Sequence, residues 1–347
     1  MIDRFIRSRV ELDWAGHQAR EARFVFSLPF KPILLLAVIA FFSVGTLAQT
    51  QPKPARLLFT GDILLSRHVI SELERRKVSP WARFTDLFQS AQWVSGNLEG
   101  ALGQASECQK PAPLCFAISE NAPALLKNAG FTGVTLENNH AADLGSVGRN
   151  RTRSLLDEAQ LTSVDFENSP HTLQIGGTRL ALLSISLIPA TDKRVQEIPS
   201  TQVAEKLRLA RERADLVVVS IHWGTEYQKL PEAIQRTQAH WLIQQGADLI
   251  VGHHPHVVEP PECVDGHPVF FSLGNHLFDQ TYPPTKEGLI ADCRLSGGRL
   301  TCQAIRTYTE DWTTIPRPAG VDPATRAALA ACVLPIRKRI KRDADKD

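Results

Sequence analysis

The stretch Asp248-Leu249-Ile250-Val251-Gly252-His253-His254-Pro255-His256 carries the strongest structural signal in this chain. Its first half is a short apolar run, which predicts a buried strand. Three histidines then follow within four positions. Neutral imidazole is the commonest metal-binding side chain, and residues two apart in an extended segment lie on the same side of it. The stretch therefore predicts a strand that ends at a metal site, with His254 and His256 as ligands.

Four other segments have the same design, an apolar run that leads to a side chain able to bind a metal. The runs and these side chains are 57–60 with Asp62, 93–95 with Glu99, 134–136 with Asn139, and 217–221 with His222. In layered α/β folds, sites assemble at the carboxyl ends of strands. Oxygen and nitrogen donors without sulfur suit divalent Mn, Fe or Zn. A bridging carboxylate would let two such ions lie about 3.5–4 Å apart, as in phosphoester hydrolysis.

Each of these side chains also has an ordinary explanation when it is considered alone. Asp62 could be a turn or N-cap residue, and Glu99 could be a carboxylate of a surface loop. Asn139 could satisfy backbone groups in a turn, and His222 could be a hydrogen-bonded core histidine. These explanations would have to hold at every strand end together, so a shared metal site is the stronger hypothesis.

The order of the predicted elements favours an α/β fold with a mixed sheet, because strands and helices alternate in the middle and hairpins follow. Helices are expected over 69–76, 81–90, 122–129, 148–159, 202–213 and 231–245, and strands over 56–60, 93–95, 133–136, 173–175, 179–186, 216–221, 249–251 and 269–272. The 347 residues and 43% hydrophobic content allow one large domain or two small ones. We expect one domain over 55–318, followed by a C-terminal helix and charged tail over 319–347.

The N-terminal segment, residues 1–54, has the features of an export signal and a polar linker. An uncharged apolar run over 33–42 extends to about Leu47, and basic residues precede it. Thr46-Leu47-Ala48 resembles a cleavage site, so the run is interpreted as a signal peptide. An uncleaved signal-anchor and a buried helix are the alternatives. With the basic residues on the cytoplasmic side, the rest of the chain would be exported, either secreted or periplasmic, or anchored to the membrane.

Six cysteines agree with an oxidising compartment. A disulfide could close the loop between Cys108 and Cys115, and another could join Cys293 to Cys302 across a hairpin at Gly297-Gly298. Free buried thiols are the alternative, and sequence does not fix the pairing. The basic run 337–342 is either a solvated helix end or a contact with anionic lipid or polymer. The formal net charge of +2 gives no support to a nucleic-acid partner.

The motifs together resemble the capsule-synthesis CapA family of poly-γ-glutamate biosynthesis proteins, a branch of the calcineurin-like metallophosphatase superfamily. The motifs that carry the resemblance are, in order, Gly61-Asp62-Ile63-Leu64-Leu65-Ser66-Arg67, Asn97-Leu98-Glu99-Gly100, Asn138-Asn139-His140-Ala141-Ala142-Asp143, Ile221-His222-Trp223-Gly224-Thr225-Glu226-Tyr227, Gly252-His253-His254-Pro255-His256 and Ser272-Leu273-Gly274-Asn275. The resemblance covers about 56–282. It implies two packed mixed β-sheets flanked by helices, with a two-metal site at one edge.

The resemblance also implies a role for each site residue. Asp62 and His256 would bind the first metal, and Glu99 would bridge both. Asn139, His222 and His254 would bind the second metal. His140 follows Asn139, where the superfamily keeps a proton donor for the leaving oxygen, a role that suits an imidazole.

Two positions depart from the superfamily pattern. Asp-x-His is usual at the first motif, but Leu64 stands at its last position, so the first metal has one ligand fewer. Glu99 stands where phosphatases usually have Asp. His276 stands where the family usually has an aromatic residue, and it either approaches the site or packs in the core.

Three further residues are candidates for substrate contacts. Arg67 could pair with a phosphate or carboxylate, or it is an ordinary arginine at a helix start. His253 is ambiguous, because either it or His254 could be the inward metal ligand. Asn275 is the third candidate and is the last residue of the motif Ser272-Leu273-Gly274-Asn275.

Two functions follow from the resemblance. The first is metal-dependent hydrolysis of a phosphoester or related bond in an anionic envelope polymer or a phosphorylated small molecule. The alternative is a binding or assembly factor for capsule polymer export, in which the metal serves recognition or structure. Other capsule-export proteins would be its partners in either case, and the N-terminal segment would contact the membrane.

Overall fold

The computed structural model describes residues 54–337, except for 112, 190–197, 199 and 311–312. The export signal expected over 1–54 and the basic run after Arg337 therefore lie outside the described residues. All elements below belong to the unit Thr50–Asp347. Among these residues, no helix combines the length and the apolar character needed to cross a membrane.

The first sheet is mixed and has nine strands among the described residues. Its main order is β18-β17-β16-β1-β2-β5-β6, while β15 pairs with β1 and β19 pairs with β17. The strands are β1 (Ala55–Ile63), β2 (Trp93–Leu98), β5 (Gly133–Thr135), β6 (Thr162–Val164), β15 (Asn275–Leu277), β16 (Glu287–Ser296), β17 (Arg299–Thr309), β18 (Pro316–Val321) and β19 (Val333–Pro335). Strands β1, β2, β5 and β6 run parallel, and β16 to β18 add an antiparallel half.

The second sheet is also mixed, with six strands in the order β12-β13-β10-β9-β8-β7 within the described part of the chain. They are β7 (His171–Ile175), β8 (Thr178–Ser186), β9 (Leu216–His222), β10 (Leu249–His253), β12 (Glu262–Val264) and β13 (His267–Phe270). Two short pairs lie outside the sheets, β3 (Ala101–Leu102) with β4 (Ala117–Ile118) and β11 (Val258–Glu259) with β14 (Ser272–Leu273). The expected strand over 269–272 is therefore split at Phe271, whose carbonyl accepts the indole N–H of Trp223.

The two sheets share one apolar core, because their inward side chains pack together. In β9, Leu216 and Val218 belong to the cluster between the sheets, whereas Val217 and Val219 belong to the cluster on the outer face. This alternation follows from the period of two in a strand. A strand that is buried on both faces has a continuous apolar sequence, which explains the Val-rich run of β9. The predicted fold of two packed mixed sheets is confirmed.

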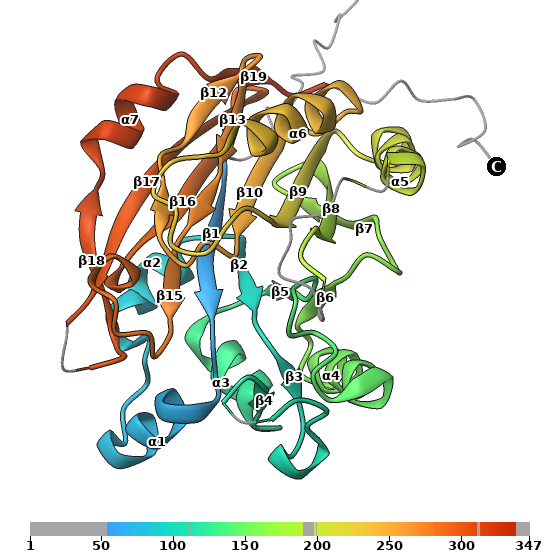
Figure 1. Ribbon diagram of the computed structural model, residues 1–347. Helices are drawn as coiled ribbons and strands as arrows, with labels where there is room; N and C mark the ends of the chain where they lie inside the picture. Colours follow the sequence, from blue (N-terminus) through green and yellow to red (C-terminus); the bar gives the residue numbers. More distant parts are fainter. Residues whose placement is uncertain (1–53, 112, 190–197, 199, 311–312, 338–347) are drawn as a thin grey trace, which may run out of the picture. The chain divides into compact units, whose positions relative to one another are not determined.

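Helices cover the outer face of each sheet (Figure 1). The helices are α1 (Arg67–Arg76), α2 (Thr85–Gln89), α3 (Ala122–Ala129), α4 (Gly145–Glu158), α5 (Ser200–Arg213), α6 (Ala233–Gln244) and α7 (Pro323–Leu329). Side chains of α1 to α4 pack on the first sheet, and those of α5 and α6 pack on the second. The single helix expected over 81–90 is a 3₁₀ turn, Ala82–Phe84, followed by α2.

Both predicted hairpins form with two-residue glycine turns. Gly176 and Gly177 have φ of 55° and 88° between β7 and β8, and Gly297 and Gly298 have 57° and 73° between β16 and β17. Two successive left-handed residues match the twist of a tight hairpin, and glycine adopts them without a steric cost.

The six cysteines form three disulfides. The bonds Cys108–Cys115 and Cys293–Cys302 are those considered from the sequence. The third, Cys263–Cys332, joins β12 of the second sheet to the residue before β19 of the first. The C-terminal segment from 319 thus contains the expected helix, α7, and also a strand that pairs with β17.

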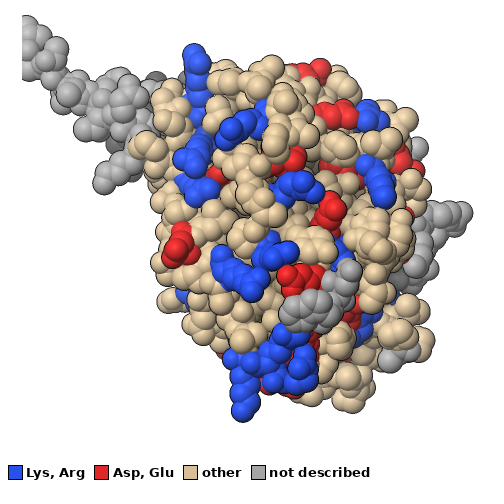
Figure 2. Space-filling view, turned by 90° about the vertical axis from the view of Figure 1, so that its left-hand side faces the viewer, with Lys and Arg blue, Asp and Glu red and all other residues tan. Residues whose placement is uncertain are grey.

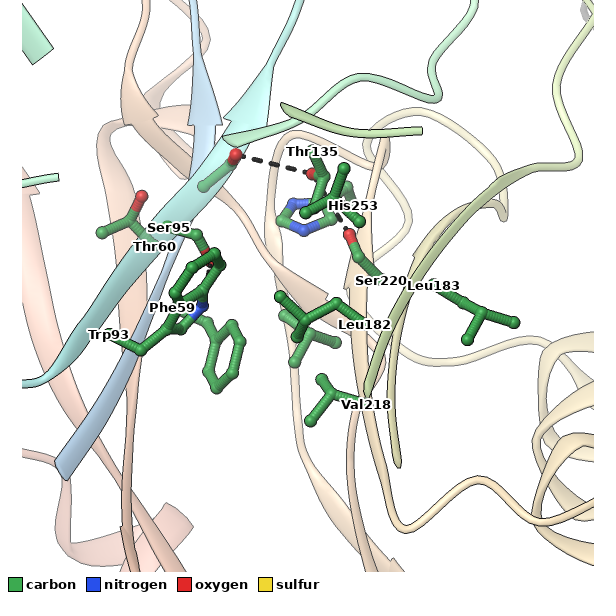
Figure 3. A pocket seen from close by; sticks show the side chains of 13 residues that line it. Phe59, Thr60, Trp93, Ser95, Thr135, Leu182, Leu183, Val218, Ser220 and His253 are labelled. Atoms are coloured by element: carbon green, nitrogen blue, oxygen red, sulfur yellow. Dashed lines mark hydrogen bonds between the residues drawn. The ribbon is translucent and has the colours of Figure 1, made fainter. Parts of the chain in front are cut away.

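Basic side chains on the face that carries β18 lie in several separate groups, with acidic side chains among them (Figure 2). Between the two sheets lies a cavity of about 10 Å³, the size of about one water molecule. Its lining mixes core side chains such as Leu182 with the polar side chains of Ser95, Thr135, Ser220 and His253 (Figure 3). Thr135 accepts a hydrogen bond from Ser220, so part of this polarity is satisfied internally.

Candidate metal centre

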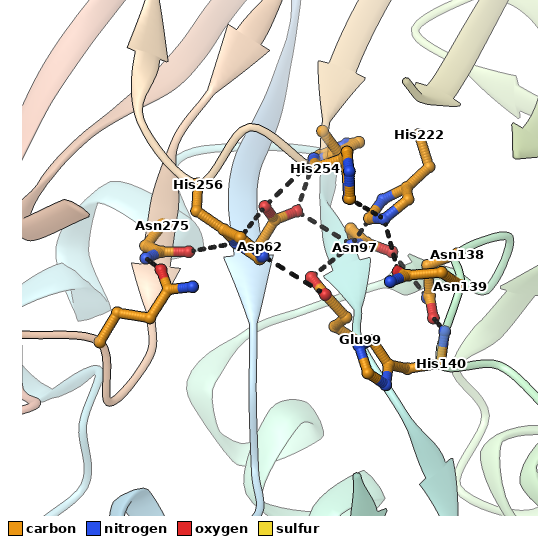
Figure 4. Close-up of polar contacts among 12 residues, drawn as sticks. Asp62, Asn97, Glu99, Asn138, Asn139, His140, His222, His254, His256 and Asn275 are labelled. Atoms are coloured by element: carbon orange, nitrogen blue, oxygen red, sulfur yellow. Dashed lines mark hydrogen bonds and ion pairs between the residues drawn. The ribbon is translucent and has the colours of Figure 1, made fainter. Parts of the chain in front are cut away.

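The predicted site residues lie together where strands of the two sheets end (Figure 4). In the first sheet, Asp62 of β1 pairs in register with Asn97 of β2. In the second, His222 ends β9 beside His253, which ends β10. Because these strands run parallel within each sheet, their carboxyl ends meet at the same edge. Glu99 directly follows β2, and the loop after β10 carries His254 and His256.

Two glycines allow the backbone to approach closely at this edge. A Cβ atom on Gly61 would lie 1.9 Å from the carbonyl oxygen of Gly274, and one on Gly252 would lie 1.9 Å from that of Phe271. Any other residue would push these segments apart, and Asp62 and His253 would move with them.

Three donors converge as the ligands of one ion would. Nε2 of His222 lies 2.9 Å from the amide oxygen of Asn139 and 3.1 Å from Nδ1 of His254. Ligands about 2.1 Å from one ion, with bonds 90–109° apart, lie about 3.0–3.4 Å from each other. The two distances are close to this range, which is compatible with a common divalent ion.

Asp62 is fully buried and accepts several polar contacts. Oδ1 lies 2.9 Å from the amide nitrogen of Asn97 and 3.2 Å from Nδ1 of His253. Oδ2 lies 3.2 Å from Nδ1 of His256 and receives the backbone N–H of His254. Burial acts to raise the pKa of Asp62, but the contacts with His253 and His256 outweigh it and hold the pKa well below its usual range.

Glu99 is also buried, but its carboxylate has fewer polar contacts than that of Asp62. Its Oε2 lies 3.3 Å from the amide nitrogen of Asn97, whereas Oε1 has no hydrogen-bond partner among the described residues. Nε2 of His256 is 3.7 Å from Oε1. Burial raises the pKa of Glu99 to about 8, although His256 acts to lower it. An uncompensated buried carboxylate is costly, so a cation would supply what Oε1 lacks.

Charge and donor type agree with a metal at this position. One ligand atom each from Asp62, Glu99 and His222 lies within 4.8 Å of the others, and all three residues are buried. His256 presents Nδ1 to the oxygens of Asp62 and Asn275, at 3.2 and 3.0 Å. An imidazole that donates from Nδ1 keeps the Nε2 lone pair for a metal. This group of residues can hold a metal ion.

His140 lies beside the centre and is oriented by its own partners. Its Nδ1 lies 2.8 Å from Oδ2 of Asp143, and its ring stacks on Phe116 with centroids 3.6 Å apart. Lys110 holds the other oxygen of Asp143 at 2.7 Å. Burial lowers the pKa of His140, and Asp143 partly opposes this effect. His140 and Asn139 are only half-buried, which makes this the more open side of the site.

Arg67 stands at the start of α1, away from the metal ligands but connected to His140. Its guanidinium lies 4.4 Å above the ring of Phe116, on which His140 also stacks. It also pairs with Asp279 and donates to the carbonyl of Pro113. Arg67 lines an open hollow of about 490 Å³, so part of the guanidinium faces solvent beside the site.

His253, His276 and Asn275 lie in three different surroundings. His253 lies behind Asp62 and lines the cavity between the sheets, whereas His254 faces His222. Asn275 is buried and bonds His256, so it holds a site histidine and does not face the hollow. His276 packs at 5.1 Å from the ring of Phe84 in the core.

Several site residues were not singled out from the sequence. The amide of Asn97 contacts Asp62, Glu99 and His222 at once. Its position two before Glu99 was the available signal, because residues two apart in a strand face the same side. Asn138 supports Asn97, and Asp143 orients His140. No feature of the sequence around Asn138 or Asp143 predicted these roles.

Strained backbone occurs at the metal centre and at the hollow beside it, as well as elsewhere in the described chain. Positive φ occurs at Arg67 (52°), Tyr227 (66°), His254 (98°) and His256 (58°). Residues with a Cβ adopt this region at a cost, and they persist in it where the surrounding structure requires it, often at ligand-binding positions.

Comparisons with known proteins give matches over most of this chain. The profile of the bacterial capsule synthesis protein PGA_cap family matches residues 56–280. The PGA biosynthesis protein CapA of Bacillus subtilis is 28% identical over 76% of this chain and 75% of its own length. The capsule biosynthesis protein CapA of Bacillus anthracis is 30% identical over 77% of this chain and 71% of its own. A solved structure described as a novel phosphatase of Mycoplasma pneumoniae is 12% identical, with a TM-score of 0.44, over 78% of this chain and 95% of that one. The chain belongs to the bacterial capsule synthesis PGA_cap family.

Proposed function

We propose that this protein is an exported, metal-dependent hydrolase that cleaves a phosphoester or related bond in an anionic envelope polymer or its phosphorylated precursor. The observation that carries the proposal is the position of His140. It follows Asn139, whose amide oxygen lies 2.9 Å from Nε2 of His222, and it is oriented by Asp143. A purely structural metal site has no use for an oriented imidazole at its open side.

Two groups of residues would hold the metal. Asn139, His222 and His254 form one group, and Asp62 and His256 form the other, with Glu99 between them. When bound, divalent ions would act as Lewis acids on the phosphoryl group and offset its developing negative charge. Mn, Fe and Zn all suit this set of nitrogen and oxygen donors.

His140 would move the proton of the reaction. In hydrolysis, the oxygen of water forms a bond to phosphorus, and the bond from phosphorus to the leaving oxygen breaks. Nδ1 of His140 is engaged by Asp143, so the protonated ring would give its Nε2 proton to the leaving oxygen. The proton that water loses goes to solvent, which balances the reaction.

The nature of the substrate is supported by the relatives and by Arg67. Their names place the two Bacillus proteins in PGA and capsule biosynthesis. Arg67 lines the hollow and lies over Phe116, on which His140 stacks, so its guanidinium would bind a second anionic group. Three disulfides support an oxidising, extracytoplasmic location.

The test is an assay of the full chain loaded with Mn, Fe or Zn, on a panel of phosphomonoesters and phosphodiesters. Turnover of one class, lost in His140→Ala with metal content unchanged, is the expected result. No turnover at full metal occupancy would refute hydrolysis.

A non-catalytic binding or assembly factor is the second candidate. The observation in its favour is Leu64, a buried apolar side chain at the position where the superfamily pattern has a metal-binding histidine. If that candidate is right, metal removal would weaken polymer binding or stability, and no substrate of the panel would turn over.

A further inference from the structure

The chain that the disulfide Cys108–Cys115 closes holds Asp143 from two sides. The backbone N–H of Gln109 donates to the carbonyl oxygen of Asp143 at 3.0 Å. The backbone N–H of Phe116 donates to Oδ2 of Asp143 at 2.8 Å. Each of these contacts comes from the residue that follows a bonded cysteine. The disulfide therefore ties together the two parts of the chain that hold Asp143.

Lys110 adds a contact to the carboxylate of Asp143. Its Nζ lies 2.7 Å from Oδ1 and donates to the backbone carbonyl of Asn139 at 3.2 Å. Among the described residues, it is the only lysine or arginine that pairs with Asp143. Asp143 is fully buried, and a buried carboxylate without a cation is costly. The pair with Lys110 therefore favours the charged form of Asp143, which can accept a hydrogen bond from His140.

The same part of the chain packs against His140. The ring of Phe116 stacks on the imidazole, with an angle of 10° between the two planes. Nδ1 of His140 lies 2.8 Å from Oδ2 of Asp143. One contact is made to the face of the imidazole and the other to its edge, so together they define the orientation of the ring. Both partners of His140 are thus held by the chain next to the disulfide.

The position of Lys110 depends on a segment without regular structure. The described residues between the 3₁₀ turn Ala105–Glu107 and β4 (Ala117–Ile118) belong to no helix or strand. Leu114 leaves 56% of its surface in solvent. Ordering such a segment, and a long lysine side chain on it, costs conformational entropy. A covalent bond across the segment lowers this cost, because it removes open conformations before the contacts form.

We infer that Lys110 is a positioning residue for His140, and that the Cys108–Cys115 disulfide holds Lys110 in place. Lys110 does not line the hollow beside Arg67, and it acts through Asp143. The effect of Lys110 on turnover rests on the proposed function, whereas its effect on the orientation of the His140 ring does not. The two effects are measured separately.

The first experiment is a double-mutant cycle on the full chain loaded with Mn, Fe or Zn, with an alkyl phosphoester as the substrate. Lys110→Met removes the charge, and kcat should fall by about tenfold or more, as when an outer partner of a metal-site residue is lost. KM should change little. The same substitution in a His140→Asn background should have little further effect, because it acts through the imidazole. Lys110→Arg keeps a cation for Asp143 and should recover most of the rate.

The double variant Cys108→Ser, Cys115→Ser tests the disulfide. It should lower kcat as Lys110→Met does, and again only where His140 is present. Cys293→Ser, Cys302→Ser is the matched control, because it opens a loop of similar length, with a separation of 9, between β16 and β17. This control should keep the kcat of the wild type.

Lys127→Met is the control for the loss of a lysine. Lys127 is exposed on α3, and its Nζ also donates to a backbone carbonyl, that of Gln160. It should keep the kcat of the wild type. Metal content is measured for every variant, because Lys110 also contacts the backbone of Asn139.

The second experiment observes the His140 ring and needs no turnover. In protein labelled with ¹⁵N at histidine, the contact with Asp143 should give a slowly exchanging Nδ1–H signal. The chain has 11 histidines, so the signal is assigned by its loss in His140→Asn. It should also be lost in Lys110→Met and in Cys108→Ser, Cys115→Ser, and it should persist in Lys110→Arg and in both controls.

Several outcomes would overturn the inference. Additive losses in the double-mutant cycle would show that Lys110 does not act through His140. So would an Nδ1–H signal that is absent from the wild type or persists in Lys110→Met. An unchanged signal in the double serine variant would refute the role of the disulfide. If that variant does not fold, Lys110→Met and Lys110→Arg still decide the role of Lys110.

Failure of the inference and failure of hydrolysis can be told apart. If no ester is cleaved but the signal is lost in Lys110→Met and kept in Lys110→Arg, the positioning role stands and the proposed reaction fails. If an ester is cleaved and Lys110→Met changes neither kcat nor the signal, the reaction stands and the positioning role fails.

Discussion

Nδ1 of His140 lies 2.8 Å from Oδ2 of Asp143, and this contact determines which nitrogen of the imidazole is available to a substrate. The carboxylate is itself held by Lys110 at 2.7 Å and by the backbone N–H of Phe116 at 2.8 Å. A carboxylate with fixed partners fixes the ring it contacts. The arrangement leaves Nε2 free of this contact, as the proposed proton transfer requires.

The role that we propose for His140 predicts that the effect of its loss depends on the leaving group. His140→Asn should reduce turnover by about 10²–10³ for an alkyl phosphoester, whose leaving oxygen needs a proton. The loss should be about tenfold or less for a p-nitrophenyl ester, whose leaving group departs as an anion. Steady-state rates for both esters, with metal content measured in parallel, check this prediction.

Asp143→Asn is the companion variant, because it keeps the size of the side chain and weakens the contact with Nδ1. The same dependence on leaving group, with a smaller loss, is expected. If both esters slow equally in His140→Asn, the residue does not act as a proton donor.

The convergence of Asn139, His222 and His254 predicts that metal binding stabilises the fold. A metal at a hundredfold excess over its Kd should add about 2.7 kcal/mol to the free energy of unfolding. His222→Ala should remove this gain and lower the metal content, because it deletes the middle donor of the three. Elemental analysis and thermal unfolding with and without metal measure both quantities.

His240→Ala, an exposed change on α6, is the control for loss of a histidine as such. Full metal content in His222→Ala would show that the ion binds elsewhere.

The sequence predicted the strand ends because each carries a local signal. A run such as Val217-Val218-Val219 favours a strand that is buried on both faces, and His222 then stands at its end. The hairpin at Gly297-Gly298 likewise placed Cys293 opposite Cys302. In both cases, the information lies within about ten residues.

Contacts between distant segments had no such signal. Cys263 and Cys332 are 69 residues apart, and neither lies next to a turn that would pair them. The connection from Tyr227 through Gln280 to Asn275 depends on how two loops pack. The sequence also did not decide whether His253 or His254 is the inward metal ligand. The packing of both sheets determines which of the two side chains faces the site.

The disulfide between the two sheets predicts a large loss of stability on its removal. Cys263–Cys332 closes a loop with a sequence separation of 69, which in the chain-entropy description corresponds to about 4 kcal/mol. Cys293–Cys302, with a separation of 9, corresponds to about 3 kcal/mol and is the matched control. Denaturant unfolding of the double serine variant of each pair should show the larger loss for Cys263→Ser, Cys332→Ser. A larger loss for Cys293→Ser, Cys302→Ser would mean that changes in the folded sheets, and not the entropy of the unfolded chain, determine the loss of stability.

His276 predicts a pH dependence of stability that one substitution should remove. The side chain is buried against Phe84 and Phe88, and neither ring nitrogen has a hydrogen-bond partner among the described residues. Burial lowers the pKa of His276 to about 3, whereas an unfolded histidine has a pKa of about 6.5. Between these values the unfolded chain binds a proton that the folded protein does not. Stability is therefore lost as the pH falls below about 6.5, by about 2 kcal/mol at pH 5.

His276→Phe keeps an aromatic ring in the same surroundings and abolishes this titration. The difference in unfolding free energy between variant and wild type should therefore grow in favour of the variant from pH 7 to pH 5. The slope is the informative quantity, because the larger ring can add a pH-independent packing cost. His68→Phe, at an exposed position of α1, controls for the loss of a histidine without burial. Denaturant unfolding at several pH values measures the slope, and parallel curves for wild type and His276→Phe would show that His276 is not buried in its neutral form.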